Sequence, residues 1–154
     1  MSKLLRLYSR FAEAASMLRS PMLLAVRLYW GFQFAQTGWG HLHSLPKFAS
    51  YFTTLNIPFP TLNAPFIGVL EFVGGILLML GLFSRPIAFL LACDMFVAFW
   101  VGEHDAFVSF FSDPGKFYVA DAYTFLFASL MILIFGAGLF SVDTLIARRL
   151  KASQ

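Results

Sequence analysis

The chain has 154 residues, of which 59% are hydrophobic and only 12% are charged, and its formal net charge is +3. A soluble domain of this length would expose much of its apolar surface to water and would tend to aggregate, so this class is excluded. The excess of basic residues lies beside apolar segments, where anionic lipid headgroups would attract it, and we expect no nucleic-acid partner. Composition therefore predicts an all-α integral membrane protein in a lipid bilayer.

The first segment, residues 1–20, has the pattern of an amphipathic helix. Its apolar residues recur at steps of four and three: Leu4, Tyr8, Phe11, Ala15 and Leu18. The basic residues Lys3, Arg6 and Arg10 fall on the other side of that helix. We expect it to lie on the cytoplasmic surface of the membrane. A signal peptide is the alternative, but Arg27 interrupts the next apolar region and no cleavage site of small residues is evident.

Residues 21–146 contain four apolar segments long enough to span a bilayer: 21–43, 64–83, 86–102 and 118–140. A very short turn separates the second from the third, so these two helices must be antiparallel neighbours. The longer connection after the first segment contains a short helix, residues 46–55, which Asn56 ends in a left-handed conformation. The sequence thus predicts a four-helix bundle with an N-terminal amphipathic surface helix and a short helix in the first outer loop.

Lysine and arginine residues outside the spans lie mostly on one side of this bundle. Eight belong to the N-terminal segment, the second-to-third turn and the C-terminal tail (147–154): Lys3, Arg6, Arg10, Arg19, Arg85, Arg148, Arg149 and Lys151. The two longer connections carry only Lys47 and Lys116. Because positively charged loops remain in the cytoplasm, we expect both termini to be cytoplasmic and residues 147–154 to form a basic tail.

Five polar residues inside the predicted spans form the candidate ligand or proton site: Arg27, Gln33, Gln36, Glu71 and Asp94. An unpaired charge at the centre of a span costs about 2.5 to 3.5 kcal/mol even on lenient insertion scales, so partners are expected. We expect Arg27 to pair with Glu71 inside the bundle. Asp94 would then lack a full counter-charge, and burial would favour its neutral form. The alternative is that the Arg–Glu pair only holds the helices in register.

Three histidines lie at the outward ends of the predicted spans: His41, His43 and His104. A cluster of histidines and carboxylates would suit zinc or copper. However, His41 and His43 point about 200° apart on a helix, which argues against one ligand set that contains both. We therefore expect no metal site, with His41 and His104 as the weak candidates.

Glycines recur at seven-residue spacing in the second span, Gly68 with Gly75 and Gly74 with Gly81. This spacing predicts stripes of small residues for close helix packing. The same region has no GxGxxG pattern after a strand, so a nucleotide-binding loop is not indicated.

Four segments carry a family resemblance when taken together: "RLYWGFQFAQTGWGHL", "IPFPTLNAPFIGVLEFVGGILLMLGLFSRP", "AFLLACDMFVAF" and "GAGLFSVDTLI". Over roughly residues 22–146 the chain resembles the DoxX family of small bacterial four-span membrane proteins. Arg27, Glu71 and Gly75 match its recurrent arginine, glutamate and glycine, and Ser141 and Asp143 match its closing serine–aspartate element. His41 stands where members commonly have a lysine, so this chain offers a titratable imidazole instead.

The resemblance implies a protein of the bacterial inner membrane with a redox role. Relatives are linked to thiosulfate:quinone oxidoreductase as a membrane subunit, which implies a quinone as the ligand and a redox subunit or a second copy as the partner. The chain has no flavin, haem or iron–sulfur motif, so its own catalytic activity and catalytic residues stay open. The alternatives are a non-catalytic membrane scaffold or assembly protein, and a small proton-coupled transporter.

Overall fold

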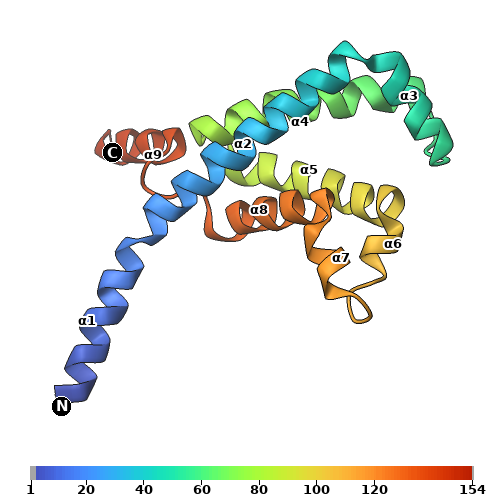
Figure 1. Cartoon of the computed structure of the whole chain (residues 1–154). Coiled ribbons are helices and arrows are strands. Elements are labelled where there is room, and N and C mark those ends of the chain that lie inside the picture. Colours follow the sequence, from blue (N-terminus) through green and yellow to red (C-terminus); the bar gives the residue numbers. More distant parts are fainter. Residues whose placement is uncertain (1–2, 154) are drawn as a thin grey trace.

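The computed structural model describes residues 3–153, and within this range the chain forms helices and no strands (Figure 1). The first helix, α1 (Lys3–Met17), extends away from the other helices and buries none of its residues. Its apolar side chains, among them Leu4, Tyr8 and Phe11, are exposed. The helix predicted within residues 1–20 is therefore confirmed, whereas its place on a membrane surface stays a prediction.

Four long helices make up the body of the molecule. In Figure 1, α2 (Arg19–His43) and α4 (Pro60–Leu80) lie side by side above α5 (Ser84–Val97) and α8 (Asp121–Phe135). A π-helical turn, η1 (Ala98–Gly102), continues α5. Because Gly81 ends α4 in a left-handed conformation and α5 begins three residues later, α4 and α5 are neighbours, as the short turn predicted.

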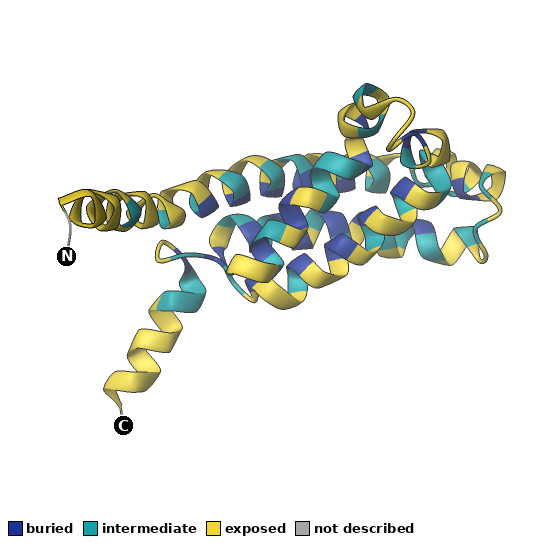
Figure 2. Ribbon diagram, turned by 90° about the horizontal axis from the view of Figure 1, so that it is seen from below, coloured by how far each residue is buried: buried dark blue, intermediate teal, exposed yellow. Residues whose placement is uncertain are grey.

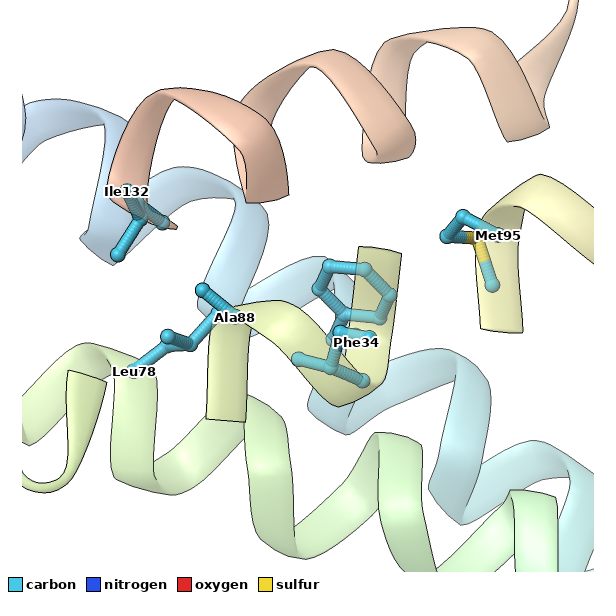
Figure 3. Packing of buried hydrophobic residues seen from close by; sticks show 6 residues of the cluster. Phe34, Leu78, Ala88, Met95 and Ile132 are labelled. Atoms are coloured by element: carbon cyan, nitrogen blue, oxygen red, sulfur yellow. The ribbon is translucent and has the colours of Figure 1, made fainter. Parts of the chain in front are cut away.

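The hydrophobic core lies where the two helix pairs meet. Phe34 of α2, Leu78 of α4 and Ile132 of α8 are almost fully buried and surround α5 (Figure 3). Phe34 also packs edge-to-face against Phe125, with ring centroids 4.6 Å apart. Buried residues follow the inner faces of the helices, and exposed residues cover their outer faces (Figure 2).

The outer faces of α4 and α5 are strongly apolar. Eight of their large apolar side chains are between 44% and 61% exposed: Phe66, Val69, Val73, Leu80, Phe89, Leu90, Phe96 and Val97. Two helical stretches, Pro60–Leu80 and Ser84–Gly102, are long and apolar enough to cross a membrane, and most of their residues are not buried. Exposure of this kind suits contact with lipid rather than with water.

The prediction of four spans is confirmed only in part. By length and apolarity α2 is long enough but less apolar than these two stretches, and α8 is apolar but has only 15 residues. The helix predicted over 118–140 is wrong in its bounds, because Ala120 is extended and Gly136 has φ of 78°. The chain there forms α7 (Pro114–Val119), α8 and a loop. A four-span bundle therefore stays a prediction.

Shorter helices close the two ends of the body. At one end lie α3 (Leu45–Thr54), α6 (His104–Phe107) and α7, and Asn56 after α3 has the predicted left-handed conformation, with φ of 55°. At the other end α9 (Val142–Ala152) begins after Ser141, whose side chain accepts a hydrogen bond from the Thr144 N–H group. The predicted boundary between bundle and tail, at residue 146, falls inside α9.

Glycines allow α2 and α4 to approach each other at backbone distance. A Cβ atom on Gly31 would lie 2.8 Å from the carbonyl oxygen of Gly75, and a Cβ atom on Gly75 would lie 2.5 Å from the backbone nitrogen of Ala35. Gly38 is similarly close to Gly68 and Phe72. The predicted packing role of Gly68 and Gly75 is confirmed, whereas Gly81 serves as a left-handed helix end.

We predict that Gly38→Ala lowers the free energy of unfolding by about 1 to 3 kcal/mol, because the added methyl group would force α2 away from α4. Gly40→Ala is the matched control on the same helix, since a Cβ atom there meets nothing within 4 Å. Its better helix propensity should stabilise the protein by about 0.5 to 1 kcal/mol. Thermal unfolding in detergent measures the stability of both variants. An equal change in stability for Gly38→Ala and Gly40→Ala would contradict the close contact between α2 and α4.

Candidate functional site

A cavity of about 920 Å³ lies at the end of the body that α3 covers, between α2, α3, α4, α5 and α8. Its walls are mainly apolar and aromatic, with Phe48, Phe52, Phe66, Leu70 and Phe125 among the lining residues. Polar side chains also line it, among them those of His41, Glu71 and Asp94. This combination of a mostly apolar wall and a few convergent polar groups is typical of small-molecule sites.

His41 and Glu71 form a hydrogen-bonded pair at the cavity. Nδ1 of His41 lies 2.7 Å from Oε2 of Glu71, and the two side chains are 30% and 4% exposed. The imidazole also stacks on the ring of Phe48, with centroids 3.7 Å apart and planes 9° from parallel. The carboxylate is thus satisfied from α2, while α3 fixes the orientation of the imidazole.

The close packing of α2 on α4 explains why these two residues meet. The antiparallel contact places Gly38 of α2 beside Gly68 of α4. The Cβ atom of His41, about one turn further along α2, also lies near Gly68. Glu71 is one turn further along α4, on the buried face. The end of α2 and the middle of α4 therefore present their polar side chains to each other.

The prediction that Arg27 pairs with Glu71 is wrong. The Arg27 side chain is fully buried beside Gly81, at the opposite end of α4, and its Nη2 atom donates a hydrogen bond to the carbonyl oxygen of Phe140. Gly81 follows Glu71 by ten residues, or about 15 Å along a helix axis. The register of the α2–α4 contact is the physical reason, because it sets Arg27 against the end of α4.

Arg27 belongs instead to a junction of three chain segments. Asp143 supplies the negative charge that acts on it. The Asp143 carboxylate accepts the N–H groups of Phe83 at 2.8 Å and Ser84 at 2.9 Å, and the Asp143 N–H group donates to the carbonyl oxygen of Gly81 at 2.9 Å. These contacts tie α2 and the start of α9 to the turn between α4 and α5, which suits a structural role.

Asp94, on α5, lines the cavity with a carboxyl group that is not satisfied by the protein. Its Oδ2 atom is buried and has no hydrogen-bond partner within residues 3–153. The charge of Glu71 acts on it across the cavity. A buried carboxyl oxygen without a partner is costly, so the cavity presents a free hydrogen-bonding group to whatever enters it.

The other predicted site residues lie outside the cavity. Gln33 is half-buried and Gln36 is exposed, and neither lines it. The Nδ1 atom of His104 lies 2.9 Å from the carbonyl oxygen of Trp100 in its own segment. Within residues 3–153 no group of three or more His, Cys, Asp and Glu side chains is arranged to hold a metal ion.

Three features of the site were missed from the sequence. His41 follows Arg27 by fourteen residues, a spacing that returns to nearly the same helix face, so the helical pattern could have indicated it as a partner for Glu71. Glu103 is not among the predicted site residues, but its Oε2 atom accepts the N–H group of Ala122 at 3.2 Å and caps α8. No sequence signal indicated the π-helical turn that borders the cavity.

Among the comparisons with known proteins, the family models gave a match. The family model described as DoxX matches residues 22–104, which is more than half of the chain and includes Arg27, His41, Glu71 and Asp94. A search of curated proteins and a search of solved structures each gave no match.

We predict that His41→Ala lowers the free energy of unfolding by about 1 to 3 kcal/mol, since it leaves a buried carboxylate without its partner. Glu71→Gln in the same chain should recover part of this loss, with a coupling of about 0.5 to 3 kcal/mol in a double-mutant cycle. His43→Ala is the matched control, because His43 is exposed and bonds only to its own helix, and it should change stability by less than about 0.5 kcal/mol. Thermal unfolding measures the stability of each variant. If the double variant loses the sum of the two single losses, the interaction between His41 and Glu71 is contradicted.

Proposed function

The chain belongs to the DoxX family, and we propose that it binds a quinone-like ligand in this cavity as the membrane subunit of a redox system. The observation that carries the proposal is the cavity of about 920 Å³, which has a mainly apolar wall and includes His41, Glu71 and Asp94 among its polar lining residues. The family and the two apolar helical stretches support a membrane protein. We further propose that the protein lies in the bacterial inner membrane, that it crosses the membrane several times and that both termini are cytoplasmic.

The chemistry of the cavity suits a quinone. Phe48, Phe66 and Phe125 offer an apolar surface for the ring and tail, and the cavity size lies within the range of small-ligand sites. A quinone carbonyl accepts hydrogen bonds, and a quinol hydroxyl group donates one. Asp94, which lacks a partner, and the imidazole of His41 can serve both states.

Reduction of a quinone to a quinol consumes two electrons and two protons. The sequence has no flavin, haem or iron–sulfur motif, and we propose that a partner subunit supplies the electrons. The side chains at the cavity would hold the ring and transfer the protons, since Asp94 and His41 are groups that gain and lose protons. A role in binding and proton transfer therefore needs fewer assumptions than complete catalysis by this chain.

The orientation follows from the charge distribution. Eight lysine and arginine residues lie on the side of the termini and of the α4–α5 turn, and two lie in the loops at the cavity end. The positive-inside rule then places the cavity in the outer half of the membrane. In this topology α2, α4, α5 with η1, and α8 are the four spans, and α2 with 25 residues is about 37 Å long.

We predict that Asp94→Ala weakens the binding of decylubiquinone to the purified full chain about fivefold, because the neutral carboxyl group would donate a hydrogen bond to a quinone carbonyl, and such a bond between neutral groups contributes about 1 kcal/mol. The same substitution should leave thermal stability unchanged or higher, because it removes a buried carboxyl group without a partner. Tryptophan fluorescence quenching measures the affinity.

Gln36→Ala is the control, since Gln36 belongs to the same predicted polar set but is exposed outside the cavity. Its affinity should remain within about twofold of the wild-type value. If the wild-type chain shows no saturable binding, or if both variants weaken it equally, the cavity is not a quinone site. If Asp94→Ala lowers stability and leaves affinity intact, Asp94 has a structural role.

A further inference from the structure

A second cavity, of about 390 Å³, lies at the opposite end of the body, where α8 ends and α9 begins. Three of its lining side chains are basic, namely those of Arg85, Arg148 and Lys151, and one is acidic, that of Asp143. We propose that this basic cavity binds the phosphate group of an anionic phospholipid. The inference is independent of the proposed quinone site, because the two cavities share no lining residue.

The local fold collects the positive charge at this point. Arg148 and Lys151 are three residues apart on α9, on the same face as Thr144, so the helix directs both toward the cavity. Arg85 reaches it from the start of α5, where its guanidinium lies beside Gly136, and its Nη2 atom is 3.4 Å from the carbonyl oxygen of Ile134. Segments that are distant in sequence thus place three cations around one space.

The acidic side chain in the cavity does not neutralise this charge. The carboxylate of Asp143 already accepts the N–H groups of Phe83 and Ser84, and the buried cation of Arg27 acts on it. By contrast, Arg148 and Lys151 are exposed and make no hydrogen bond or ion pair within residues 3–153. Two unpaired cations therefore remain available for an anion.

Apolar surface beside the cavity favours a lipid over a soluble anion. Ile134 and Phe135, which precede the lining residue Gly136, are 62% and 42% exposed. On α9, Leu145 and Leu150 are 58% and 62% exposed, and they lie off the face that lines the cavity. A phospholipid can place its phosphate between the cations and its acyl chains along these residues, which is how basic cavities beside spanning helices recognise anionic lipids.

The test uses the purified full chain in neutral detergent, with phosphatidylglycerol, phosphatidylcholine or inorganic phosphate as the probe and native mass spectrometry as the readout. We expect the wild-type chain to bind phosphatidylglycerol at least tenfold more tightly than phosphatidylcholine. The double variant Arg148→Gln/Lys151→Gln should lose about 30-fold in affinity for phosphatidylglycerol. Both residues are exposed, so the variant should fold like the wild type.

The matched control is Arg6→Gln/Arg10→Gln, which removes the same charge from the exposed face of α1. Its affinity for phosphatidylglycerol should stay within about threefold of the wild-type value. An equal loss in both double variants would overturn the proposal, because the attraction would then be diffuse. The proposal also fails if inorganic phosphate binds with the same dependence on Arg148 and Lys151, since the cavity would then take soluble anions.

Discussion

The close contact between α2 and α4 determines which polar side chains of the two helices meet. Gly31, Gly38 and Gly75 allow the backbones to approach so closely that a methyl group would clash at each position. Such a contact can form in only one register, since a shift by one turn would place larger side chains against the opposing backbone. This register sets His41 against Glu71 and Arg27 against the end of α4.

The two buried charges consequently have different surroundings, and only Glu71 is hydrogen-bonded to another side chain within residues 3–153. At the end of the body near α9, Arg27 is fully buried among main-chain groups and the carboxylate of Asp143, an arrangement that fixes the α4–α5 turn. At the other end, Glu71 is paired with a half-buried imidazole that borders a cavity. The sequence left two interpretations open, a structural ion pair and a ligand site. The positions of the residues support a structural role without an ion pair to Glu71 for Arg27, and a ligand site for Glu71 and Asp94.

Much of the helical architecture could be predicted from the sequence, because period, apolar length and turn residues are local signals. The short helix before Asn56 and the tight turn before Ser84 are examples. The partner of Glu71 could not be predicted from the depth of each residue in the membrane alone. If α2 is shifted along α4 by a few turns, His41 lies opposite Glu71 in place of Arg27. The end of the last span was also wrong, because the sequence does not show that Gly136 adopts a positive φ. Gln33 and Gln36 were included for their polarity, but neither lines the cavity, and Gln36 is exposed.

The size and polarity of the cavity argue against a purely structural role for its acids. Protein interiors are packed to high density, and a polar group that only joined helices would be surrounded by side chains and hydrogen-bond partners. Here Asp94 has a buried oxygen without a protein partner, next to a space of about 920 Å³. A π-helical turn, of the kind often found at functional sites, borders the same space through Val101 and Gly102. In a scaffold, apolar side chains in place of this space and this carboxyl group would add stability, so the presence of both supports the proposed ligand.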